Sequence, residues 1–85
     1  MTPTPAIPEY HACTPEAIDA LERAVRDHRR VALMRRGTEY VVVAERLEPR
    51  GVGGVGGEVL HGRLPMTGEV LEFALGDLEW FAVLP

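Results

Sequence analysis

The sequence predicts an α+β domain that is mostly β, in which one N-terminal helix precedes a small barrel of five short strands. Apolar residues follow a helical period of about 3.6 from Pro15 and an alternating period of two from Val31 onward. Glycine and proline interrupt the second region at short intervals. The chain has 85 residues, which suits a single domain. We therefore expect one domain at residues 15–85, after a proline-rich tail at residues 1–14.

The helix is predicted to begin at the Thr-Pro-Glu sequence of residues 14–16. Threonine is a favoured N-cap residue, proline suits the first helical position, and an acidic side chain complements the positive end of the helix dipole. Ile18, Leu21 and Val25 then form one apolar stripe. We expect the helix to end near residues 29–30, where two arginines suit the negative end of the dipole.

Five strands are predicted from the alternation of apolar residues and from the residues that interrupt it. Their expected ranges are 31–36, 39–47, 58–64, 69–75 and 78–84. The second strand should be central in the sheet, because both of its faces are apolar through residue 44. Residues 50–57 contain five glycines and indicate a flexible loop.

The charge of the chain is unevenly distributed. The net charge is −4, but residues 23–50 carry eight arginines against four acids, and both flanking segments are acidic. An acidic protein is a poor non-specific ligand for nucleic acid, because such binding depends on neutralising phosphates. The central segment still leaves room for a local basic patch.

The sequence contains no signature of an enzyme, a metal site or a cofactor site. Cys13 is the only cysteine, and with His11, His28 and His61 it falls short of a structural zinc set. Nothing in the local sequence supports a nucleophile and base made from Cys13 and a histidine. A domain this small usually needs a disulfide, a metal or a partner subunit, so we expect a homo-oligomer.

The glycine-rich segment at residues 51–56 matches the spacing G-x-G-x-x-G. That motif binds a pyrophosphate where the glycines lead into a helix. Here a predicted strand follows, so we expect no nucleotide cofactor. No signal peptide and no apolar run of about 20 residues is present, which predicts a cytoplasmic protein without a membrane partner.

The closing region has the pattern Phe-x-Leu-x-x-Leu followed by Val-Leu. The residues that carry it are Phe73, Leu75, Leu78, Val83 and Leu84. In this pattern and in the order of its elements, the chain over residues 17–84 resembles the small SH3-like or Sm-like barrel of WYL-type bacterial regulatory domains. The resemblance implies the fold. The chain lacks a Trp-Tyr-Leu sequence and has Leu71 and Asp77 where those domains carry arginines, so it does not imply their ligand-binding role.

Five arginines are candidates for contact with an anion or a nucleic acid. They are Arg26, Arg29, Arg30, Arg35 and Arg36. Their guanidinium groups match phosphate and carboxylate geometry. The alternative is structural: the arginines of residues 29–30 would complement the helix end, whereas Arg35 and Arg36 would point to opposite faces of a strand and could not act together.

Trp80 and Phe81 are neighbours on the last predicted strand and must point to opposite faces. Only one can fill a narrow barrel, so the other needs a cover: the helix, the tail or another chain. We expect a self-association surface on this strand, formed by Leu78, Trp80, Phe81 and Val83. The predicted function is a non-catalytic interaction or regulatory module. The alternative is an Sm-like nucleic-acid-binding protein that uses the central arginines.

Overall fold

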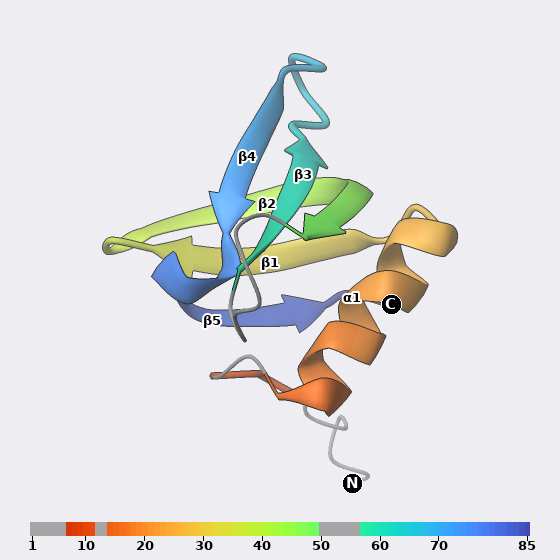
Figure 1. The fold of residues 1–85 in the computed structure, drawn as a ribbon. Helices are drawn as coiled ribbons and strands as arrows, with labels where there is room; N and C mark the ends of the chain where they lie inside the picture. Colours follow the sequence, from red (N-terminus) through yellow and green to blue (C-terminus); the bar gives the residue numbers. More distant parts are fainter. Residues whose placement is uncertain (1–6, 12–13, 50–56) are drawn as a thin grey trace, which may run out of the picture.

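The computed structural model describes residues 7–11, 14–49 and 57–85. Within these residues it contains one helix, five strands and a short 3-10 turn, in the predicted order (Figure 1). Their bounds are α1 Pro15–Arg26, β1 Arg30–Arg35, β2 Thr38–Pro49, β3 Glu58–Arg63, β4 Val70–Ala74, η1 Leu75–Asp77 and β5 Leu78–Val83. The α+β, mostly β fold class is confirmed. None of the described residues forms a helix long and apolar enough to cross a membrane.

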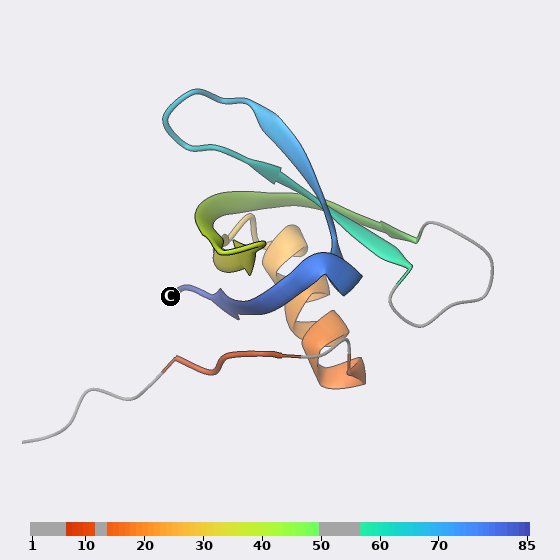
Figure 2. The same cartoon turned by 90° about the vertical axis from the view of Figure 1, so that its left-hand side faces the viewer.

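The five strands form one antiparallel sheet in the order β4-β3-β2-β1-β5. The central place of β2 agrees with its two apolar faces. The sheet curves strongly, and the β3–β4 hairpin crosses above β1 and projects away from the helix (Figures 1 and 2). The described strands β4 and β5 are edge strands that do not pair with each other. The structure therefore contains a curved open sheet in place of the hydrogen-bonded barrel that the sequence predicts.

The start of α1 is as predicted, but its end is not. Thr14 is the N-cap, and its Oγ1 accepts a hydrogen bond from the amide of Ala17 at 3.2 Å. The helix ends at Arg26, three to four residues before the expected end near residues 29–30. His28 adopts a φ of 50°, and the amide of Arg29 donates to the carbonyl of Ala24 at 2.9 Å. This is the Schellman termination, which usually has glycine at the position of His28.

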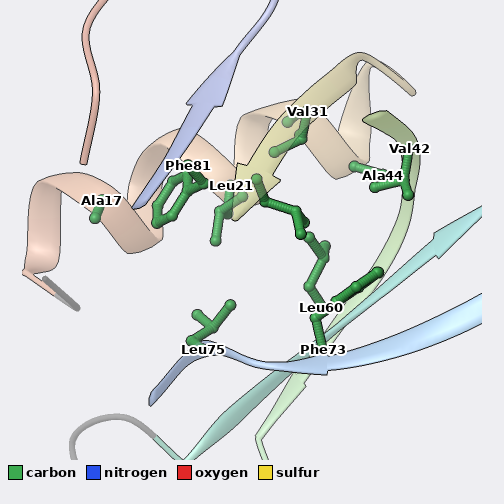
Figure 3. Packing of buried hydrophobic residues seen from close by; sticks show 11 residues of the cluster. Ala17, Leu21, Val31, Val42, Ala44, Leu60, Phe73, Leu75 and Phe81 are labelled. Carbon is green, nitrogen blue, oxygen red and sulfur yellow. The ribbon is translucent and has the colours of Figure 1, made fainter. Parts of the chain in front are cut away.

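The apolar core lies between α1, the β1–β2–β5 part of the sheet and the β3–β4 hairpin (Figure 3). Alanine and leucine side chains of α1 contact valines and leucines of β1 and β2, and Leu60, Phe73 and Leu75 close the opposite side. Leu21, Leu33 and Phe73 are fully buried. Burial of each such side chain stabilises the fold by roughly 1.5–3 kcal/mol.

The N-terminal segment pairs at Tyr10 with the edge of β5 that faces away from β1. The amide of Tyr10 donates to the carbonyl of Phe81 at 2.8 Å, and the amide of Phe81 donates to the carbonyl of Tyr10 at 3.0 Å. The two rings stack with their centroids 5.1 Å apart. Phe81 is only 3% exposed. Of the three covers that the sequence leaves open for this ring, the structure contains two, the tail and the helix, because Phe81 also belongs to the core cluster with Ala17 and Leu21 of α1 (Figure 3).

The side chain of Arg35 bridges β1 and β4, which do not pair as strands. Its guanidinium donates to the carbonyl of Glu72 at 3.2 Å and to the hydroxyl of Tyr40 at 3.4 Å. It also lies 4.7 Å from the ring centroid of Phe73 and 5.3 Å from that of Tyr40. Arg35 thus joins β4 to β1 through a side chain.

Candidate functional site

The five candidate arginines lie in two groups at opposite ends of β1. Arg26, Arg29 and Arg30 lie where α1 leads into β1, and all three are exposed. Arg35 and Arg36 lie at the other end of the strand. Arg30 and Arg35 are five positions apart along the strand, which corresponds to about 17 Å. The arginines therefore do not make one continuous basic patch.

Arg35 and Arg36 line one pocket, contrary to the prediction that they point to opposite faces. The pocket has a volume of about 390 Å³ and is completed by Thr38, Tyr40 and Asp77. Arg36 lies beyond the end of β1 with a φ of 51°, so the alternation of the strand no longer sets its direction. Arg35 is already engaged by β4, and Asp77 adds a negative charge. The pocket therefore offers an anion only one uncommitted guanidinium.

The outer side of the sheet carries a set of apolar side chains, which we name the outer apolar face. Cross-strand pairing places Met34 beside Trp80, and Ala32 between Val41 and Ala82. Its members are Ala32, Met34, Val41, Val43, Trp80 and Ala82. They lie on the side of the sheet opposite Leu33 and Phe81 and do not belong to the core cluster. Val41 is 40% exposed, Met34 and Trp80 are half-buried, and Ala32, Val43 and Ala82 are buried.

The four residues predicted for self-association do not share one surface. Trp80 belongs to the outer apolar face. Phe81 is buried beneath Tyr10, and Leu78 and Val83 pack against the core. Trp80 is therefore the member of this set that lies on the outer side of the sheet.

A groove of about 680 Å³ lies between α1, the N-terminal segment and the C-terminal end of the chain. We name it the α1 groove. Ala20 and Ala24 form its helical wall, Val83 and Leu84 lie opposite, and Tyr10 forms part of a third side. Sequence reasoning missed this groove, because it depends on the pairing of Tyr10 with Phe81, and a single bridge leaves no periodic signal in the sequence.

His61 lies on β3 between two carboxylates of neighbouring strands. Its Nε2 is 3.0 Å from Oε1 of Glu48, and its Nδ1 is 3.8 Å from Oε1 of Glu72. An imidazole and two carboxylates are ligands that zinc accepts, and one such atom from each residue lies within 4.8 Å of the others. The two carboxylates contact different ring nitrogens, however, and Arg46 also holds Glu48 at 2.8 Å. This arrangement is that of an ion-pair network.

The other candidate features give no site within the described residues. His11 is exposed, and His28 lies 3.7 Å from Glu45. Cys13 and residues 50–56 of the glycine-rich loop lie outside the part of the chain that the structure describes. The hypotheses built on them stay predictions.

Comparison with protein-family models, curated proteins and solved structures gave no match for this chain. The fold and the three surfaces described above therefore carry the functional argument.

Proposed function

We propose that this protein is a non-catalytic interaction module that self-associates through the outer apolar face. The observation that carries the proposal is the cluster of Met34, Val41 and Trp80 on three neighbouring strands, outside the core. A chain of this size buries only roughly 60% of its unfolded surface, so its own core is small. A second copy on this face would bury apolar area that the single chain leaves partly in water.

The charges at the two ends of the outer apolar face support a symmetric contact. Arg30 lies on the same side of the sheet at one end, where it pairs with Val43. Glu39 lies at the other end, opposite Met34. Both are exposed. A two-fold copy packed face to face, with its strands reversed, would place Arg30 near Glu39 of the partner subunit.

Sedimentation velocity over a range of protein concentrations tests this proposal. We expect the wild-type chain to form dimers, and Trp80→Ala to raise the dissociation constant about 30-fold or more, as expected for a central interface aromatic. Val41→Glu should also raise the dissociation constant of the dimer, because it would bury a carboxylate in the contact. Val70→Glu is the matched control, since Val70 is 52% exposed on β4, outside the outer apolar face.

Charge exchange tests the orientation of the two copies. Arg30→Glu and Glu39→Arg should each weaken the dimer, and the double variant should restore it. A wild-type chain that stays monomeric at high concentration would contradict the proposal, and so would a dimer that Val41→Glu does not weaken.

The second candidate is the Sm-like nucleic-acid-binding function suggested by the central arginines. Its support is that Arg29, Arg30 and Arg36 are exposed and make no ion pair with other described residues. The net charge of −4 and the separation of the arginines into two groups weigh against it. We therefore rank it below self-association.

A further inference from the structure

We propose that the α1 groove binds an aliphatic carboxylate, such as a fatty acid, with the acyl chain in the groove and the carboxylate at Arg23 and Arg29. This site is separate from the outer apolar face and does not depend on self-association.

The walls of the groove suit an acyl chain. Ala20 and Ala24 line it from α1 with small, buried apolar side chains, and Arg23 of the same helix lies at its rim. Val83 and Leu84 supply larger apolar side chains on the opposite wall. The volume of about 680 Å³ lies within the range of roughly 300–1,000 Å³ that is typical of small-molecule sites.

The rim of the groove carries two guanidinium groups. Arg23 lies in the last turn of α1, and Arg29 lies just beyond it. The backbone of Arg29 is fixed from both sides, because its amide donates to Ala24 and its carbonyl accepts from the amide of Ala44, both at 2.9 Å. Neither arginine makes an ion pair with another described residue.

One acidic residue also lies at the rim. Asp27 lines the groove, but its Oδ1 lies 3.5 Å from Nε of Arg26, so that arginine already balances its charge. The rim therefore has a surplus of positive charge on a protein whose net charge is −4. Guanidinium groups bind carboxylates through parallel hydrogen bonds. An apolar ligand with a carboxylate end can pack its chain against the walls and pair its charge with the guanidinium groups at the rim. A cationic amphiphile would be repelled by those groups.

Titration of ¹⁵N-labelled protein with decanoate, below its micelle concentration, tests the proposal by NMR. We expect chemical-shift changes to concentrate at Ala20, Ala24, Val83 and Leu84. Decan-1-ol, which has the same chain and no charge, should bind at the same place about fivefold more weakly, because charge pairs at an exposed rim contribute modestly.

Three variants separate the contributions of the walls and the rim. Arg23→Gln with Arg29→Gln should weaken decanoate binding about fivefold or more and leave decan-1-ol binding unchanged. Ala20→Trp should fill the groove and abolish binding of both. Arg36→Gln with Arg46→Gln removes the same charge away from the groove, and it should change neither.

Several results would overturn the proposal. These are an absence of localised shifts, equal binding of the two ligands, or equal weakening by the two double-arginine variants. Shifts at the groove that depend on protein concentration without any ligand would indicate that a second copy occupies it. Val41→Glu should leave decanoate binding intact, so failure of the self-association proposal is distinguishable from failure of this one.

Discussion

At position 62 the sheet has no room for a side chain. A Cβ atom placed on Gly62 would lie 2.5 Å from Cγ2 of Val42 and 2.8 Å from its Cβ, closer than real Cβ atoms approach. Val42 is fully buried and cannot move aside freely. We predict that Gly62→Ala lowers the free energy of unfolding by about 1–3 kcal/mol through overpacking, measured by urea denaturation.

The control for this prediction is a double-mutant cycle with Val42→Ala. Removing the two methyl groups of Val42 destabilises the core on its own. It should also make room for the methyl group that Gly62→Ala adds, so the double variant should lose less stability than the sum of the two single losses. Additive losses would contradict the contact with Val42 as the cause.

Single residues account for much of what the sequence could not predict. The cap at Thr14 could be predicted, because threonine followed by proline is a local signal. The end of α1 could not, since His28 adopts a left-handed conformation where the sequence offers no glycine. The shared pocket of Arg35 and Arg36 has the same origin, because Arg36 also has a positive φ. Left-handed conformations of ordinary residues depend on tertiary contacts.

At the scale of elements, Arg35 links β1 to β4, two strands that have no backbone pairing with each other. Its guanidinium connects β1 to the carbonyl of Glu72 and covers the rings of Tyr40 and Phe73. We predict that Arg35→Met lowers the free energy of unfolding by about 1–2 kcal/mol, because both the hydrogen bonds and the cation–π contacts are lost. Amide hydrogen exchange in β4 should accelerate.

Arg35→Lys separates charge from geometry in this bridge. A lysine keeps the positive charge but lacks the planar fork that reaches Glu72 and Tyr40 together. We expect the free energy of unfolding of Arg35→Lys to lie below that of the wild type and above that of Arg35→Met. Unchanged stability in Arg35→Met would show that β4 is held by its pairing with β3 alone.

The strands were largely predictable, because short runs rich in apolar residues, some alternating and some apolar on both faces, are separated by glycine and proline. The contribution of Tyr10 was not, since one residue pair gives no alternation. The groove depends on that pair, so it could not be predicted either. The outer apolar face was predicted in part, through Trp80. Its other members could not be assigned to one face from the sequence, because that assignment requires the register of β1 with β2 and β5.

At the scale of the whole molecule, the charge distribution determines the affinity of the protein for nucleic acid. The net charge is −4, and the five candidate arginines are divided between the two ends of β1. We predict only weak binding of single-stranded RNA or DNA at physiological salt, measured by fluorescence anisotropy. The logarithm of the binding constant should fall only slowly with the logarithm of the salt concentration, because a shallow slope corresponds to few phosphate contacts.

Tight binding with a steep salt dependence would contradict this prediction. If replacement of Arg29, Arg30 and Arg36 by glutamine then abolished the binding, the nucleic-acid function would become the better proposal. The matched control is replacement of Arg46, which is already paired with Glu48.

The order of the strands also determines when the protein can fold during its synthesis. The β1–β2 and β3–β4 hairpins join neighbours in the sequence and can form as each pair leaves the ribosome. The other side of β1 pairs with the last strand, where Val31 meets Val83. Phe81 belongs to this strand and completes the core beside α1. The part of α1 that packs beside Phe81 therefore stays in water until translation has passed β5, whereas β1 and β2 can cover the rest of its apolar side earlier. Folding of this domain is completed only after β5 emerges.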